Sequence, residues 1–185
     1  MQTSRSAQID DLDAIKTSVE QSDAAILILG EEAILSGEAH CRAELNLPGA
    51  QEQLLASLKP LNTPLILVIM AGRPLTLENV IPNVDAILYA WHPGTMGGPA
   101  IADLLFGKAN PSGKLPVTFP RKVGQIPIYY GQKASGKPVG EHNFVNIDNI
   151  PVRAPQTSLG MAASHLDTHY TPQYPFGFGL SYSQF

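Results

Sequence analysis

The chain has 185 residues, of which 44% are hydrophobic and 15% are charged, and its formal net charge at pH 7 is −4. This length and composition are sufficient for one compact domain with a sizeable core. The mild negative charge and the lack of a basic block exclude an obvious nucleic-acid or anionic-membrane partner. The single cysteine, Cys41, excludes a disulfide within the chain, and no metal-ligand spacing surrounds it.

The first seventy residues are predicted to alternate helices with buried strands. A first helix is expected after Asp10 and Asp11, with Leu12 and Val19 on its apolar face. Residues 24–29 form a continuous apolar run, which is typical of a parallel strand with helices on both faces. This pattern predicts an α/β fold.

The same alternation continues over the next forty residues. A second helix is expected to begin at Pro48 and to end at Pro60, because proline suits a helix start and interrupts a helix interior. Apolar strands are predicted at 64–70 and 85–91, and a third helix at 98–106. Right-handed crossovers between parallel strands are the simplest connection of these elements.

Beyond Gly107 the pattern weakens. Segments 115–119 and 126–130 are typical of two further strands, whereas residues 131–171 show little periodicity. A loop of forty residues is uncommon inside a compact domain and usually has a function or is disordered. We therefore expect one domain over 1–185, divided into a disordered leader at 1–8, an α/β core at 9–130, a long loop at 131–171 and a C-terminal segment at 172–185.

The most informative segment, residues 30–48, directly follows the first predicted strand. It contains Glu31, Glu32 and Glu38, and Gly37 lets the backbone turn sharply just before Glu38. Open α/β folds place their chemistry in such loops, at the carboxyl ends of parallel strands. The segment therefore suits a carboxyl group held over a neighbouring cleft as a general acid/base. From these residues alone, a solvated acidic loop is the alternative.

Five segments in order along the chain together resemble one known family. They are residues 30–48, 70–75, 91–98, 105–120 (LFGKANPSGKLPVTFP) and 174–182 (YPFGFGLSY). In this combination they resemble the C-terminal α/β sandwich domain of glycoside hydrolase family 3, of the bacterial β-glucosidase and β-xylosidase type. The resemblance runs from about Ile9 to Phe185. It implies a mostly parallel sheet of about six strands between helices, as in flavodoxin-like three-layer α/β/α folds, with a long irregular C-terminal tail.

The resemblance also implies two catalytic carboxyl groups. Retaining glycosidases hold a nucleophile and a general acid/base about 5–5.5 Å apart. In family 3 the nucleophile is an Asp on an N-terminal barrel domain, which is absent from this sequence, and the acid/base is usually a Glu on a loop of the sandwich domain. Glu38 is the position that resembles this acid/base. Glu31 is the second candidate, although it could instead bond loop amides and fix the loop.

Further side chains near this loop are predicted to bind substrate or to support the site: His40, Arg42, Arg73, Trp91 and His92. His40 and Arg42 could orient Glu38 through a charge-assisted hydrogen bond, or could simply face solvent. Arg73 could bond a carboxylate of the 30–48 loop or one at the domain interface. Trp91 could stack on a sugar ring, although an aromatic residue at a strand end more often packs in a core or an interface.

We therefore expect the C-terminal domain of a retaining β-glycosidase that hydrolyses a β-linked oligosaccharide or an aryl glycoside without a metal or cofactor. Its partner would be the N-terminal barrel domain of the same enzyme. Without the nucleophile, the isolated chain is expected to be inactive, and surface that normally faces the barrel could cause self-association.

Residues Met1 to Ser6 lack an apolar stretch, so no signal peptide is expected, although the resemblance suggests a periplasmic or secreted enzyme.

Two other classes of protein compete with this interpretation. One is a non-catalytic carbohydrate-binding or scaffold α/β domain, in which Glu38 transfers no proton. The other is a nucleotide-binding flavodoxin-like domain. The series Gly94, Gly97 and Gly98 lacks the Gly-Lys-Ser/Thr ending of a phosphate loop. The acidic loop after the first strand would also repel a phosphate group, which makes the nucleotide-binding class the weakest of the three.

Overall fold

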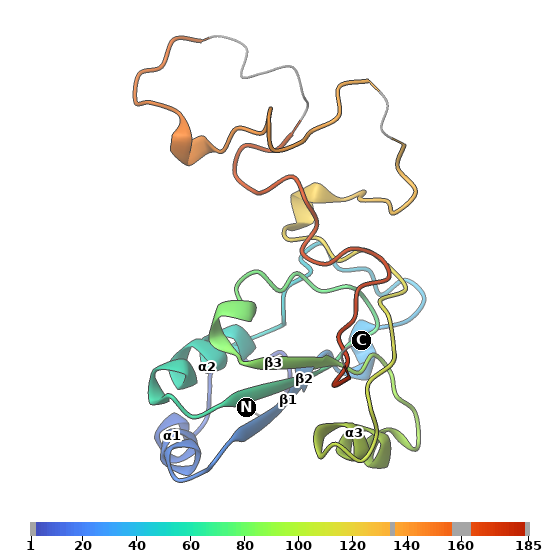
Figure 1. Ribbon diagram of the computed structural model, residues 1–185. Coiled ribbons are helices and arrows are strands. Elements are labelled where there is room, and N and C mark those ends of the chain that lie inside the picture. The colour runs from blue at the N-terminus through green and yellow to red at the C-terminus, as the bar shows by residue number, and fades with distance from the viewer. Residues whose placement is uncertain (1–2, 134–135, 157–163, 184–185) are drawn as a thin grey trace.

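The computed structural model describes residues 3–133, 136–156 and 164–183, and a parallel sheet lies at its centre (Figure 1). The strands are β1 (Ala25–Gly30), β2 (Leu65–Met70) and β3 (Ala86–Tyr89), in the order β1-β2-β3. The helices are α1 (Leu12–Glu20), α2 (Gln51–Leu58) and α3 (Gly97–Leu105). Short 3₁₀ helices are η1 (Ala33–Leu35), η2 (Lys59–Leu61), η3 (Ile81–Asn83), η4 (Val123–Gln125) and η5 (Ile147–Asn149).

One face of the sheet carries the core. Along β2 the side chains of Leu65, Leu67 and Ile69 point to this face and are fully buried. Leu54 and Leu58 of α2 pack beside Leu65, and α1 adds its apolar side to the same cluster. Figure 1 shows α1 and α2 together on one side of the sheet, with α3 apart from them. The predicted α/β class with parallel strands is therefore confirmed.

The opposite face of β1 is open, in contrast to the expectation that helices cover both faces of this strand. Ile26 and Ile28 are 43% and 62% exposed, and half-buried residues alternate with them. β1 lies at the edge of the sheet, and in the described part of the chain little packs on this side of it. The expected number of about six strands is matched only loosely, since the described residues form a sheet of three.

The two strands predicted after residue 107 are not formed as continuous strands. Segment 115–119 pairs with the C-terminal segment through one antiparallel bridge, Phe119 to Tyr174. Segment 126–130 has no strand at all. Proline explains both results, because Pro116 and Pro127 lack the backbone N–H group that a ladder requires.

The long irregular C-terminal tail is confirmed. After α3, the described residues contain two short 3₁₀ helices, η4 and η5, and no α-helix. Figure 1 shows much of the described chain between residues 131 and 171 lying away from the sheet before residues 172–183 return to it. In this outer region the rings of His169 and Tyr170 stack with centroids 4.5 Å apart. The division into a leader, a core, a long loop and a C-terminal segment at the predicted boundaries stays a prediction.

An aromatic cluster ties this tail to the carboxyl end of β3. Tyr89 lies at the end of β3 and Trp91 just beyond it, with ring centroids 4.8 Å apart. Phe119 packs edge-on against both rings, at 4.9 Å from Tyr89 and 5.8 Å from Trp91. Such pairs contribute about 0.5–1.5 kcal/mol beyond the area they bury. The cluster therefore holds the loop after β3 against the segment that pairs with the C-terminus.

Gly30, the last residue of β1, is a point at which the fold tolerates no side chain. Its φ is +140°, and a Cβ atom there would lie 2.0 Å from the carbonyl oxygen of Met70. We expect Gly30→Ala to lower the free energy of unfolding by roughly 2–5 kcal/mol, because backbone strain and a backbone clash add. Urea unfolding of the chain, followed by circular dichroism, measures this change.

Gly98→Ala in α3 is the matched control, because a Cβ atom there meets nothing within 4 Å. This variant should unfold within about 1 kcal/mol of the parent chain. Equal unfolding free energies for the two variants would contradict the role given to Gly30.

Candidate functional site

The loops that follow the parallel strands meet at one edge of the sheet. The loop after β1 comprises residues 31–46, and the loops after β2 and β3 begin at Ala71 and Ala90. Contact between all three loops occurs at Gly72. A Cβ atom there would lie 2.5 Å from His92 Nε2 and 3.0 Å from Ser36 Oγ. The absence of a side chain at Gly72 therefore lets His92 pack against the loop that carries Glu38.

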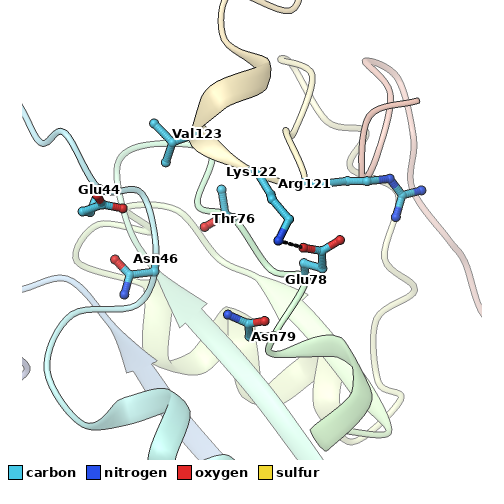
Figure 2. A pocket seen from close by; sticks show the side chains of 8 residues that line it. All are labelled: Glu44, Asn46, Thr76, Glu78, Asn79, Arg121, Lys122 and Val123. Atoms are coloured by element: carbon cyan, nitrogen blue, oxygen red, sulfur yellow. Dashed lines mark ion pairs between the residues drawn. The ribbon is translucent and has the colours of Figure 1, made fainter. Parts of the chain in front are cut away.

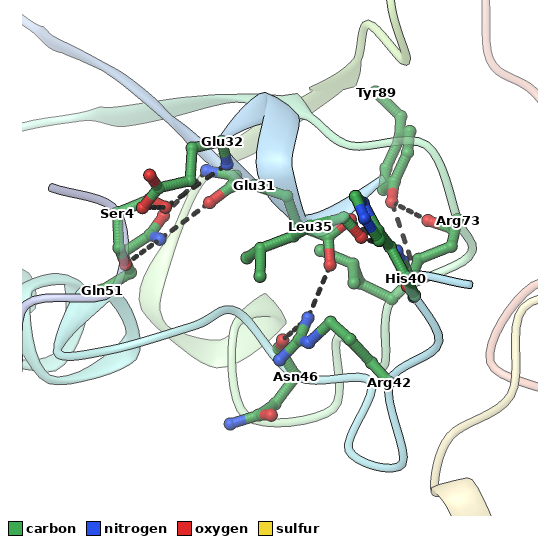
Figure 3. Close-up of polar contacts among 12 residues, drawn as sticks. Ser4, Glu31, Glu32, Leu35, His40, Arg42, Asn46, Gln51, Arg73 and Tyr89 are labelled. Carbon is green, nitrogen blue, oxygen red and sulfur yellow. Dashed lines mark hydrogen bonds and ion pairs between the residues drawn. The ribbon is translucent and has the colours of Figure 1, made fainter. Parts of the chain in front are cut away.

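Glu31 is the buried centre of this edge. Its side chain has no exposed surface, and each of its carboxylate oxygens accepts from a different guanidinium group. Arg42 Nη1 lies 2.6 Å from Oε1, and Arg73 Nε lies 3.1 Å from Oε2 (Figure 3). Charge-assisted hydrogen bonds of this kind satisfy a carboxylate that water cannot reach. Glu31 thus joins the loop after β1 to the loop after β2.

The same two arginines also bind backbone carbonyl groups of the loop. Arg73 Nη2 donates to the carbonyl oxygens of Leu35 and His40, the latter at 3.2 Å. Arg42 Nη1 donates to the carbonyl oxygen of Asn46 at 3.1 Å (Figure 3). These carbonyl groups lie before and after the tip of the loop. The tip is therefore held at its base on both sides.

Tyr89 fixes the backbone of Arg73 in turn. The Tyr89 hydroxyl donates to the carbonyl oxygen of Arg73 and accepts from the backbone N–H of Leu75 at 3.4 Å. Burial raises the pKa of this hydroxyl well above its usual value. Tyr89 consequently remains a neutral hydrogen-bond donor throughout the physiological pH range.

Gln51 holds the other end of the loop, where it leaves β1. This residue of α2 is buried, and its amide both accepts from Gly30 N at 2.7 Å and donates to Gly30 O at 2.8 Å. Its Nε2 also donates to the carbonyl oxygen of Ser4 at 2.9 Å. On the outer side, Arg5 Nε lies 2.9 Å from Glu32 Oε1. Residues near the N-terminus therefore brace the start of the loop.

Glu38 lies at the exposed tip of the loop that these contacts hold. Gly37 before it has φ +139° and Ala39 after it has φ +63°, so the chain turns sharply at this position. Within the described part of the chain, the Glu38 carboxylate makes no hydrogen bond or ion pair with another residue. Its oxygens therefore face solvent and can accept an external partner.

The structure places the predicted supporting residues at this edge, but not all of them near solvent. His40 is exposed beside Gly37, and His92 is exposed beside Gly72. The Arg42 guanidinium contacts Glu31, and Trp91 packs in the aromatic cluster. Stacking of Trp91 on a sugar ring stays a prediction.

Sequence reasoning missed Gln51 and Tyr89. A signal for Gln51 was present, because it is a polar residue beside the apolar positions Leu54, Leu55 and Leu58 of the same helix. The role of Tyr89 has no comparable local signal. Aromatic residues are common in strands, and the acceptor of its hydroxyl lies in another loop.

A polar cavity of about 290 Å³ opens next to this edge (Figure 2). Within it, Lys122 Nζ lies 3.0 Å from Glu78 Oε2, so two of its charges neutralise each other. Its lining residues do not include Glu38: they are Glu44, Asn46, Thr76, Glu78, Asn79, Arg121, Lys122 and Val123. The cavity therefore borders the end of the Glu38 loop, at Glu44 and Asn46, and does not include the Glu38 side chain.

Among the described residues, neither a metal-binding cluster nor a membrane-spanning helix is present. No group of three or more His, Cys, Asp and Glu side chains is arranged there to hold a metal ion. None of the helices described is long and apolar enough to span a bilayer.

Comparison with known proteins places this architecture in a family. The chain matches the profile of the glycosyl hydrolase family 3 C-terminal domain over residues 4–182. It is 40% identical to a periplasmic beta-glucosidase of Salmonella typhimurium over 94% of this chain and 21% of that protein. It is 35% identical to a beta-xylosidase of Formosa agariphila over 91% of this chain and 20% of that protein.

A solved structure agrees with the sequence relatives. The beta-glucosidase from Listeria innocua, in complex with gluconolactone, superposes with a TM-score of 0.84 and 36% identity over 97% of this chain and 23% of that chain. The chain thus spans about a fifth of the length of the curated relatives. With the profile match over nearly its whole length, it belongs to the glycosyl hydrolase family 3 C-terminal domain family.

Proposed function

We propose that this chain is the C-terminal domain of a retaining β-glycosidase and that Glu38 is its general acid/base. The nucleophile would lie on an N-terminal barrel domain of the same enzyme. The observation that carries the proposal is a contrast within one loop. The Glu38 carboxylate is exposed and has no partner among the described residues, whereas the base of the loop is buried and fully bonded. A general acid must reach the leaving oxygen, so it needs a free carboxyl group on a rigid support.

The chemistry proposed for Glu38 has two steps. It would first donate its proton to the glycosidic oxygen while the barrel nucleophile forms a covalent glycosyl-enzyme intermediate. It would then take a proton from the water that hydrolyses this intermediate, which returns the carboxyl group to its first state. His40 in this loop and His92 in the loop after β3 are both exposed and would contact the substrate.

The names of the relatives support the proposed substrate and location. Several relatives are beta-glucosidases or beta-xylosidases, so we propose a β-linked oligosaccharide or an aryl β-glycoside as substrate, with a β-glucoside first. One relative is named periplasmic, and on this ground we propose a periplasmic or secreted enzyme. No step of the proposed mechanism requires a metal or a cofactor.

The decisive experiment uses the longest native protein that carries this segment. Glu38→Ala should lower kcat/KM for a β-linked disaccharide by about 10²–10⁴-fold, because its leaving group needs protonation. For an aryl β-glucoside with a good leaving group, kcat/KM should fall far less, because it reports the first step, which needs little protonation. Azide should restore turnover and yield a β-glycosyl azide, since it needs no general base.

Two controls complete this experiment. Glu44→Ala removes another exposed carboxylate of the same loop and should affect both substrates equally and weakly. The isolated chain should hydrolyse neither substrate, because it supplies no nucleophile. Equal loss on both substrates for Glu38→Ala, without azide rescue, would refute the acid/base role. Intact activity would instead favour a non-catalytic carbohydrate-binding or scaffold domain.

We also propose that the isolated chain self-associates through the open face of β1. Ile26 and Ile28 expose apolar surface there, and such surface favours contact with another protein. Sedimentation velocity should show the apparent mass rising with concentration, and Ile28→Gln should weaken this rise. A strict monomer at every concentration would contradict the proposal.

A further inference from the structure

We propose that Glu31 is the positioning residue of the acid/base, and that it acts on Glu38 through Arg42 and Arg73. This inference rests on the proposed function of Glu38 and adds a second requirement for the reaction. In this arrangement Glu31 does not exchange a proton with the substrate. It fixes the two guanidinium groups that hold the base of the Glu38 loop.

The contacts of Glu31 exclude it as the acid. Its side chain has no exposed surface, so a glycosidic oxygen cannot reach it. Both of its oxygens already accept from arginines, at 2.6 Å and 3.1 Å. The carboxylate is therefore occupied on both sides, whereas the Glu38 carboxylate is open to an external partner.

The geometry of Arg73 connects Glu31 to the tip of the loop. Its Nε binds Glu31, and its Nη2 binds the carbonyl oxygens of Leu35 and His40. These two residues lie three positions before and two positions after Glu38. One planar guanidinium group thus sets the distance and the direction between the two ends of the turn that carries Glu38.

Arg42 connects Glu31 to a backbone carbonyl group further along the loop. Its Nη1 bridges Glu31 Oε1 and the carbonyl oxygen of Asn46 at 2.6 Å and 3.1 Å. The Arg42 and Arg73 side chains are only 15% and 18% exposed, so water competes weakly for these bonds. Loss of the Glu31 charge would leave two buried cations facing each other without their shared anion. The turn would then lose the support on which its orientation depends.

This role predicts a kinetic signature. Glu31→Gln in the longest native protein that carries this segment should lower kcat/KM for a β-linked disaccharide by about 10- to 100-fold. For an aryl β-glucoside with a good leaving group, kcat/KM should fall by less than about threefold, because it reports the first step, which needs little protonation. Azide should give no rescue, because the Glu38 carboxylate is still present.

A double variant tests whether Glu31 acts through Glu38. If it does, Glu31→Gln should cause no further loss of disaccharide hydrolysis in the Glu38→Ala background. Asp103→Asn is the matched control, since it breaks an exposed ion pair with Lys108 at α3, away from the Glu38 loop, and should leave both activities unchanged. Thermal unfolding should be followed for every variant.

A second variant decides the matter where Glu31→Gln fails to fold. Arg73→Lys retains the positive charge beside Glu31 but cannot bridge it to two carbonyl groups, so it should show the same dependence on the leaving group. Equal loss on both substrates, or additive losses in the double variant, would overturn the inference. Absence of leaving-group dependence for Glu38→Ala alone would instead show that the proposed function itself is wrong.

Discussion

A carboxylate without exposed surface needs hydrogen-bonding partners, and the partners of Glu31 connect the loops at the carboxyl end of the sheet. Burying a charge costs several kcal/mol unless it is paired and hydrogen-bonded. The partners come from two different loops, because Arg42 follows β1 and Arg73 follows β2. The Glu31 carboxylate can therefore be fully hydrogen-bonded only if both loops meet at this edge of the sheet. Tyr89 extends the same network to β3 through the Arg73 carbonyl group. The edge of the sheet thus behaves as one connected unit.

Glu31 and Glu38 lie seven positions apart in the sequence, and we propose a structural role for the first and a chemical role for the second. One carboxylate is enclosed and bonded on both oxygens, and the other is exposed and unpartnered in the described part of the chain. Such a division is what a domain needs when its acid must reach across to a nucleophile on another domain. The chain spans about a fifth of the length of its curated relatives. Under the proposed function, Glu38 would act together with a nucleophile outside this chain.

The sequence predicted the central elements well, because their signals are local. Apolar runs without alternation identified the strands at 64–70 and 85–91 to within two residues at either end, and Gly37 marked the turn before Glu38. The apolar residues of 115–119 predicted a continuous strand, which was wrong. These residues pack, but Pro116 prevents a continuous ladder of backbone hydrogen bonds. The roles of Gln51 and Tyr89 depend on backbone groups in distant loops, which no local pattern reveals.

In the proposed mechanism, Glu38, supported by Glu31, meets the leaving oxygen. The most direct measurement is a crystal structure of the longest native protein that carries this segment, with its nucleophile replaced and a β-linked disaccharide bound. We expect a Glu38 carboxyl oxygen within about 2.6–3.2 Å of the glycosidic oxygen, while Glu31 remains between its two arginines. Another carboxyl group at that oxygen, with Glu38 turned to solvent, would contradict it.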